Sequence, residues 1–452
     1  MSVEQEYIDI YRQFSTQIKQ NAAEQTNAVR DAAFDCFAQQ GFPTAALEGY
    51  QHSNLQERYA VNYGINLSQF NIAFNPYESF RCDVQSIKSH LLFVVNDVFC
   101  DETQQAQLVL DNLSKQGVIA GSLRKVGAQH PELLKRFYAK AADFNSDATV
   151  AFNTAFAMDG LFLYVPKGVK LDAPVQLINV MNGDADSMAT SRNLVIIDEG
   201  ARAQLLVCGH AAKSCKYLCN RVTEVFVGKN ANYEQYKLED TTADTTNIGS
   251  LFVQQDEASD VLINEITLHN GFTRNNVNVD LLGEHASLNL CGMAIGDKQE
   301  HIDNHTFINH AVPHCHSTEL YKYVLNDAAV GSFDGKILVR PGAQKTEAYQ
   351  SNKNIVVTQS AKMYTKPHLE IYADDVKCSH GAAVGQLDEE AIFYMRSRGI
   401  SLTEARMLLM LAFANDVVEN IKIEALRTRM HLLIEKRFRG ENYKCNSCDS
   451  CK

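Results

Sequence analysis

The spacing of hydrophobic positions changes along the chain and predicts three kinds of architecture in succession. Apolar residues recur every three to four positions in YIDIYRQFSTQI and NAVRDAAFDCFAQQ, which predicts helices within residues 1–40 that stop at Gly41-Phe42-Pro43. From about residue 43 to 150 the pattern is mixed, because SHLLFVVNDVFC is typical of a strand hairpin and PELLKRFYAKAADF of a helix. We therefore expect residues 1–150 to form an N-terminal region that is mostly helical or α+β.

From about residue 160, short apolar strands break at a turn and restart just after an alanine. The alanines, about 28 residues apart, are Ala173, Ala201, Ala231, Ala258 and Ala286, and the fourth residues after them are Leu177, Leu205, Gln235, Leu262 and Leu290. A small corner residue followed by an inward leucine suits a stack of coils, because no coil can cover its own apolar face. An antiparallel sandwich or barrel also uses short strands, but the near-constant spacing favours the stack. The pattern predicts a mainly β protein with a parallel β-helix over residues 151–383.

A helical pattern replaces the strand pattern after about residue 385. The segment LDEEAIFYMRSRG has acidic residues in its first turn, arginines in its last turn and Gly399 as its stop, which complements the helix dipole. The capping box SLTE opens a second helix, in which residues 407–414 (MLLMLAFA) are apolar all round. Such a helix is covered on several sides, either by its own domain or by its own domain and a partner. We predict a C-terminal helical domain over residues 384–439 and a mobile cysteine-rich tail over residues 440–452.

Composition and charge exclude several classes of function. The net charge of −12 is spread over the 452 residues, which argues against a dedicated nucleic-acid surface. No stretch reaches the ~18 apolar residues of a membrane helix, and the start MSVEQEYIDIYRQF lacks the apolar segment of a secretory signal. We therefore expect a soluble cytoplasmic protein that binds no membrane and whose twelve cysteines are reduced. The sequence has no phosphate-binding loop, GxGxxG motif or nucleophile elbow, so any ATP hydrolysis is expected on another subunit.

A histidine-rich stretch is the first candidate for metal chemistry. The segment EHIDNHTFINHAVPHCHSTELYKY contains His301, His305, His310, His314 and His316. Residues two apart on a strand face the same side, so His314 and His316 form a candidate metal pair whose third ligand would come from another coil. A ladder of imidazoles that only stabilises the coils is an equally good interpretation, because the spacing fits no closed metal site. A metal-dependent enzyme that uses His301, His305, His314 and His316 is therefore the alternative function.

Two cysteine motifs are the other candidates. Cys378 and His380, in the segment CSH where the strand pattern ends, would project from one strand face, where the imidazole could stabilise a thiolate. Simple packing is the alternative for this pair. The tail YKCNSCDSCK contains Cys445, Cys448 and Cys451, which could hold a soft metal, a cluster or a persulfide transiently. The tail lacks a fourth ligand, so an inert tail remains the alternative.

Several long segments resemble the SufB/SufD family of iron–sulfur cluster assembly proteins. These segments are NTAFAMDGLFLYVPKGV, NHAVPHCHSTELYKYVL, GSFDGKILVRPGAQKTEAYQSNKNIVV and KPHLEIYADDVKCSHGAAVGQLDEEAIFYMRSRGIS. The resemblance runs from about residue 150 to 435 and is weaker before that. It implies a right-handed parallel β-helix followed by a C-terminal helical domain. The chain is most similar to the SufD branch, because Gly381 stands where the SufB branch is expected to carry a carboxylate.

The resemblance implies a scaffold subunit rather than an enzyme. It implies a heterodimer with SufB through the β-helices and docking of the ATPase SufC on the C-terminal helices. For the isolated chain, a monomer and a homodimer are both open. His380 matches the SufD histidine at the SufB–SufD interface, where iron entry or nascent cluster assembly is expected, and Cys378 is its neighbour. No tightly bound cofactor is implied, only transient iron or a transient iron–sulfur cluster at that interface. The residues predicted to dock SufC are Leu387, Ile392, Tyr394, Met395, Leu408 and Leu411. A SufB-like primary scaffold is the alternative within the family, disfavoured by Gly381.

Overall fold

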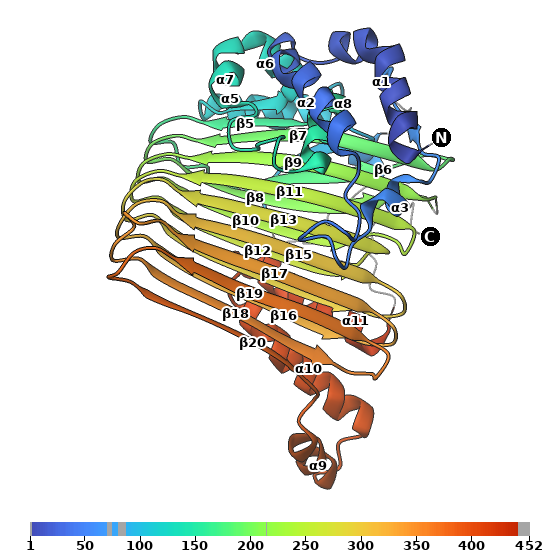
Figure 1. Cartoon of the computed structure of the whole chain (residues 1–452), viewed down its shortest axis with the longest axis vertical. Coiled ribbons are helices and arrows are strands. Elements are labelled where there is room, and N and C mark those ends of the chain that lie inside the picture. The colour runs from blue at the N-terminus through green and yellow to red at the C-terminus, as the bar shows by residue number, and fades with distance from the viewer. Residues whose placement is uncertain (1, 70–74, 80–86, 214, 442–452) are drawn as a thin grey trace.

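The computed structural model describes residues 2–69, 75–79, 87–213 and 215–441. These residues form a parallel β-solenoid of about eight turns with helices at both ends (Figure 1). Strands account for 39% of the chain and helices for 28%. The predicted mainly β class and the predicted parallel β-helix are therefore confirmed. None of the described helices combines the length and apolar character needed to span a membrane.

The N-terminal helices cover the first coils of the solenoid (Figure 1). They are α1 (Val3–Gln20), α2 (Asn27–Gln40), α3 (Leu55–Tyr59), α4 (Pro76–Ser79), α5 (Gln104–Lys115), α6 (Leu123–Gln129), α7 (Pro131–Phe137) and α8 (Ala148–Phe156), with a short 3-10 helix at Glu24–Thr26. Gly41, with φ of 68°, ends α2 where the sequence predicted a stop. Tyr7 and Phe37 pack edge-on against Phe152 of α8, which is buried along its whole length. An aromatic core thus joins the helices to the solenoid.

Short strands from the N-terminal region extend the sheets of the solenoid. They are β1 (Gly64–Ile65), β2 (His90–Val95), β3 (Val98–Phe99) and β4 (Ile119–Ser122). β2 and β3 form the predicted antiparallel hairpin, and β2 also pairs in parallel with a solenoid strand, β6 (Val175–Met181). β4 pairs antiparallel with β5 (Leu161–Val165). The division near residue 151 stays a prediction, and the two sheets begin before it.

Two parallel sheets make up the solenoid, and the chain alternates between them. Sheet A continues from β5 through β7 (Ser187–Ile197), β9 (Tyr217–Val227), β11 (Thr245–Gln255), β13 (Phe272–Leu281), β15 (His301–His310), β17 (Val330–Val339) and β19 (Lys362–Ile371). Sheet B continues from β6 through β8 (Arg202–Ala211), β10 (Asn232–Asp240), β12 (Asp260–His269), β14 (Ser287–Gly296), β16 (His316–Leu325), β18 (Glu347–Val356) and β20 (Lys377–Gly385). Successive coils pair almost entirely in register, so each inward side chain lies over its equivalent in the coil before.

The register confirms the alanine repeat in part and corrects it in one coil. Ala201, Ala231 and Ala286 are buried at the corners, and Ala173 is partly buried. In the coil between Ala231 and Ala286, the buried corner residue is Ser259, whereas Ala258 lies exposed in the turn with φ of 54°. The inward positions of that coil are therefore displaced by one residue. Ile263 points into the core, and Leu262 lies on the outer face under the C-terminal helices.

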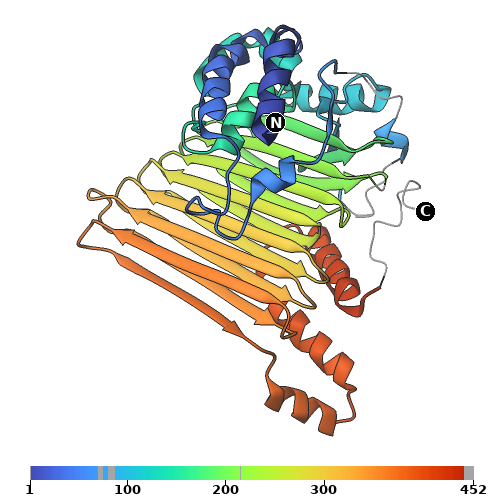
Figure 2. The same ribbon diagram turned by 45° about the vertical axis from the view of Figure 1, so that its right-hand side comes forward.

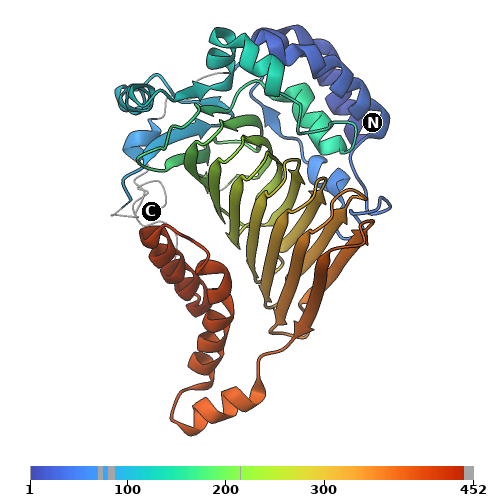
Figure 3. The ribbon, with the colours of Figure 1, turned by 90° about the vertical axis from the view of Figure 1, so that its left-hand side faces the viewer.

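Three C-terminal helices follow the last strand: α9 (Glu389–Ser397), α10 (Leu402–Val418) and α11 (Glu424–Arg439). α9 projects beyond the last coil, and α10 and α11 return along the outside of sheet B (Figure 3). Asp388 caps α9, and the Oγ atom of Ser401 accepts the Glu404 N–H at 3.2 Å to cap α10. Residues of α10 such as Val417 pack on sheet B, so the helix that is apolar all round is covered on that side by its own chain.

The stacking of coils leaves no space for a side chain at Gly292, which gives a testable prediction. This residue pairs in register with Tyr321, and a Cβ atom at position 292 would lie 2.1 Å from the ring carbon Cε1 of Tyr321. Overpacking of this kind costs about 1–3 kcal/mol. We expect Gly292→Ala to lower the free energy of unfolding by about that amount in urea titrations followed by circular dichroism. Gly381→Ala is the control, because a Cβ atom there meets no atom within 4 Å. Equal stability of the two variants would contradict the packing described here.

Candidate functional site at the end of the solenoid

The last coil leaves one end of the solenoid uncovered. β19 and β20 are the final strands of their sheets, and no other described strand pairs with their outer edges. Nearly all of β20 is exposed. Large apolar side chains on and beside the last coil are exposed as well, namely Tyr349, Tyr364, Ile371, Tyr372 and Val384. A long, regular and exposed edge strand is a template for pairing with another chain, so this end has the character of an interface.

Cys378 and His380 lie on this last strand and share one face, as predicted. They pair in register with Ala348 and Gln350 of β18, both of which are buried inside the solenoid. Cys378 is partly buried against the apolar core, whereas His380 is exposed. Burial raises the pKa of the Cys378 thiol, and a hydrogen bond with the backbone of Ala348 lowers it by less. This burial favours the packing interpretation of Cys378 over stabilisation of its thiolate, and His380 is the more accessible metal-binding group.

A buried polar pair lies in the same column as His380, one and two coils deeper. Gln350 is in register with Glu319 of β16, and its Nε2 atom donates to Glu319 Oε2 at 2.7 Å. Burial raises the pKa of Glu319 to about 7, against the smaller lowering effect of hydrogen bonds from Thr306 and Gln350. The sequence analysis missed this pair. The available signal was the alternation in HSTELYKYV, which puts Glu319 on the same strand face as the buried Tyr321.

The C-terminal helices expose apolar side chains next to the last coil. Among the predicted docking residues, Tyr394 is 58% exposed and Leu408 is 39% exposed. Met395 and Leu411 are partly exposed, but Leu387 and Ile392 are buried against Ile355 of β18. The sequence analysis did not select Phe393, which is 76% exposed, or Leu402. We call Phe393, Tyr394, Leu402 and Leu408 the α9–α10 apolar residues. Leu387 and Ile392 hold α9 against the solenoid, so their own contact with a partner stays a prediction.

The first part of the histidine-rich stretch, residues 301–305, holds the N-terminal region on the solenoid. The segment 43–63 crosses the outer face of sheet A, seen in blue in Figure 2. Ser53 of this segment donates to Asp303, which also pairs with Arg274 at 2.6 Å and with His305 at 3.0 Å. Burial lowers the pKa of His301 to about 4, so this imidazole is neutral at physiological pH. These side chains therefore stabilise the contact between the segment 43–63 and the outer face of sheet A.

The candidate metal pair does not share a strand face. His314 lies in a turn with φ of 61° and stacks on His285, with ring centroids 5.0 Å apart. β16 begins only at His316, which lies 4.0 Å from Glu347. Within the described part of the chain, no group of three or more His, Cys, Asp or Glu side chains could hold a metal ion. The predicted tail ligands Cys445, Cys448 and Cys451 lie outside the described residues.

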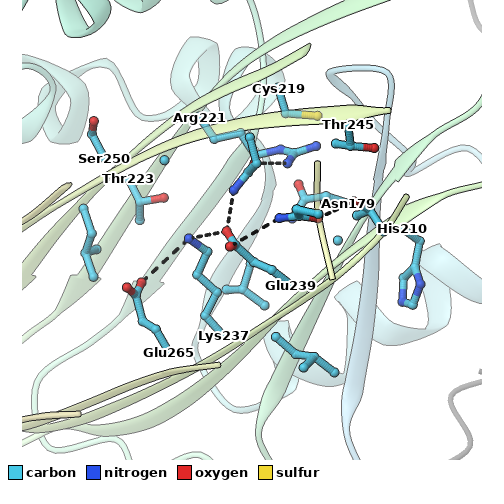
Figure 4. Close-up of a pocket in the computed structure, with 18 of the residues that line it drawn as sticks. Asn179, His210, Cys219, Arg221, Thr223, Lys237, Glu239, Thr245, Ser250 and Glu265 are labelled. Atoms are coloured by element: carbon cyan, nitrogen blue, oxygen red, sulfur yellow. Dashed lines mark hydrogen bonds and ion pairs between the residues drawn. The ribbon is translucent and has the colours of Figure 1, made fainter. Parts of the chain in front are cut away.

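A polar cavity of about 70 Å³ lies between the two sheets in the middle of the solenoid (Figure 4). Arg221 reaches it from sheet A, and Lys237, Glu239 and Glu265 reach it from sheet B. The Nζ atom of Lys237 lies 2.7 Å from Glu239 and 3.8 Å from Glu265. Two cations and two carboxylates thus compensate one another. Four strand spacings, or roughly 19 Å, separate Glu265 on β12 from the last coil, so this cluster supports the interior of the solenoid and not its end.

The buried Glu319 makes the stability of the chain depend on pH in a defined direction. Its pKa rises from the usual 4.5 to about 7 on folding, so the folded chain holds this proton more tightly than the unfolded chain. The resulting stabilisation is complete below pH 4.5 and is lost as the pH rises through 7. We expect Glu319→Gln to gain about 3 kcal/mol in unfolding free energy relative to the native chain between pH 4.5 and pH 8. Denaturant titrations across this range test it, with the exposed Glu389→Gln as control; a constant difference would contradict it.

Comparisons with known proteins agree with this architecture. A family model described as "SUF system FeS cluster assembly, SufBD core domain" matches residues 179–413, and one described as "SufBD protein N-terminal region" matches residues 1–177. An iron–sulfur cluster assembly SufBD family protein of Synechocystis is 26% identical over 417 residues, 90% of either chain. SufD of Escherichia coli is 31% identical over 281 residues, 61% of this chain and 66% of that protein. SufD of Bacillus subtilis is 24% identical over 341 residues, 75% of this chain and 78% of that protein. With a solenoid core and N-terminal region that both match, this chain belongs to the SufB/SufD family of iron–sulfur cluster assembly proteins.

Proposed function

We propose that this chain is the SufD-like subunit of a complex on which iron–sulfur clusters are assembled. One observation carries the proposal: the last coil is uncovered, and it offers His380 and Cys378 at an exposed edge. Gly381 beside this pair and the relatives named SufD support the SufD branch over the SufB branch. The chain works as a scaffold, with iron or a nascent cluster as its cargo and not as a resident cofactor, and the complex works in the cytoplasm.

In this complex, the edges of β19 and β20 pair with the last coil of a SufB partner. The backbone hydrogen bonds of both sheets would continue into SufB across this interface, which we call the seam. Both edges are long and regular, and their backbone groups have no strand partner among the described residues. Apolar side chains such as Tyr349 and Val384 would be buried there. His380 would then lie between two chains, where a neutral imidazole is a good ligand for iron. Without SufB, the same edge would pair two copies of this chain.

The α9–α10 apolar residues receive the ATPase SufC in this proposal. The chain has no phosphate-binding loop of its own, so ATP hydrolysis falls to that partner. β20 ends at Gly385 and α9 begins at Glu389, so only three residues separate the last strand from the proposed docking helix. A movement of the docked ATPase would therefore reach the last coil directly, and rigid-body movement of this kind is a common way to open or close an interface.

The first test of the proposed function removes the imidazole from the seam. We expect His380→Ala to lower the rate of cluster formation by the complex about tenfold or more, because a metal-binding group is lost. The visible absorbance of the cluster, followed after addition of iron, a sulfur donor and ATP, measures this rate. His368→Ala is the control, since the side chain of this histidine is 44% exposed and lies on the neighbouring β19. Native rates in the His380 variant would refute a role for this residue in assembly.

A second test separates docking of the ATPase from pairing with SufB. We expect the double variant Tyr394→Asp/Leu408→Asp to weaken SufC binding by about 30-fold or more, because charges replace central apolar contacts. Leu432→Asp on α11 is the control, since its leucine is 41% exposed, much like Leu408. Titration calorimetry with purified SufC gives the dissociation constants, and circular dichroism checks the fold. Equal affinity of the double variant and the control would place the docking site elsewhere.

A further inference from the structure

The last coil covers a buried hydrogen-bond acceptor that lacks a partner. Gln350 is only 3% exposed, and its carbonyl oxygen Oε1 has no hydrogen-bond partner in the structure. Its amide nitrogen is already used, because it donates to Glu319 at 2.7 Å. A buried acceptor left unpaired costs about 1–3 kcal/mol, so proteins rarely leave one without a purpose.

Glu319 decides which end of the Gln350 amide remains available. The side chain of Glu319 is 2% exposed, and above its pKa of about 7 the ionised carboxylate can only accept hydrogen bonds, as it does from the Gln350 amide nitrogen. It therefore holds the amide with its nitrogen toward β16 and leaves the oxygen for another donor. If residue 319 carried both a donor and an acceptor, the amide of Gln350 could take either orientation.

The neighbouring strands of sheet A offer no donor to this oxygen at the same level. Gly335 of β17, which the Gln350 amide approaches, has no side chain, and the residue in register with it on β19 is Pro367, which has no N–H. The next residue in the column of Gln350 is His380 on β20. Adjacent strands lie roughly 4.8 Å apart, so an imidazole at this position can reach the oxygen by rotation about its side-chain bonds.

We infer that Glu319 and Gln350 position the His380 imidazole, with Gln350 Oε1 accepting one ring N–H so that the other ring nitrogen presents its lone pair to the seam. This inference rests on the proposed function only for the identity of the cargo, ferrous iron or a nascent cluster. A neutral imidazole carries one N–H and one lone pair, so a hydrogen bond at one nitrogen fixes the role of the other. Covering the end of the solenoid would strengthen the hydrogen bond, because it removes competing water. Glu319 and Gln350 are therefore positioning residues that need not touch the cargo.

Two single variants and one exchange test the positioning. Gln350→Leu removes the acceptor, and Glu319→Gln releases the orientation of the amide. We expect each to slow cluster formation by the complex about tenfold, the usual scale for losing a group that orients a metal ligand. The exchange Glu319→Gln/Gln350→Glu restores an acceptor at position 350, held by the amide nitrogen at position 319, and should recover most of the native rate. Recovery by exchange is a result that loss of packing alone does not produce.

Gln235→Leu is the matched control, because Gln235 is a buried amide of the same column, in register with Leu205 and Ile263, and it accepts a hydrogen bond from Tyr233 at 2.8 Å. It lies five coils away from His380 and should leave the rate of cluster formation unchanged. The single variants should also add no further loss to His380→Ala, since they act through that imidazole.

The outcomes separate this inference from the proposed function. Native rates in Gln350→Leu, together with a loss in His380→Ala, would overturn the positioning and leave the proposed function intact. A loss in Gln350→Leu that persists in the His380→Ala background, or that the exchange does not recover, would also overturn it. If His380→Ala itself assembles clusters at the native rate, the proposed function fails first, and the inference fails with it.

Discussion

In a parallel solenoid, the backbone hydrogen bonds of each coil are completed by the next coil. The last coil therefore has no strand to pair with unless another element or another chain covers it. Every internal strand of sheets A and B both donates backbone hydrogen bonds to and accepts them from each of its two neighbours, so the last strand of a sheet is left with a row of unpaired N–H and C=O groups. At the N-terminal end the chain solves this problem itself, because β3 and β4 pair antiparallel with their neighbours and the helices pack over the first coils. At the other end it does not. The position of the candidate site follows from this asymmetry, since the uncovered coil is where a partner stabilises the chain most.

The same in-register stacking links the interior to that end. Because side chains repeat in columns, a residue two coils deep influences the last coil without touching solvent. The column that contains Leu205 and Ile263 is interrupted by the amide Gln235 between them, and toward the last coil it is polar at Glu319, Gln350 and His380. Burial of an acid normally destabilises a fold. Here the acid accepts a hydrogen bond from the amide below the exposed histidine, so a local cost in stability would accompany the inferred positioning of the imidazole at the last coil.

The histidines show why residue type alone is a weak guide to chemistry. The stretch around His301 and His305 is rich in metal-binding side chains, yet Asp303 in the same stretch is occupied by Arg274 and by Ser53 from the N-terminal segment. Those two residues lie far from residue 303 along the chain, so the local sequence does not predict their contacts with Asp303. Conversely, Cys378 and His380 stand out little in composition, and their candidacy as site residues rests on their place on the last strand.

Local rules in the sequence determined much of this protein. The helix caps at Asp388 and Ser401 and the coil repeat follow from short-range preferences and periodicity, which neighbouring residues set by themselves, and the family follows from the resemblance of several long segments. Tertiary structure decided the rest. It moved the corner of one coil from Ala258 to Ser259, buried Leu387 and Ile392 while leaving Phe393 exposed, and raised the pKa of Cys378 by burial. Burial decides each of these features, and burial depends on which coils and helices cover a residue, a relation between distant segments that no local pattern records.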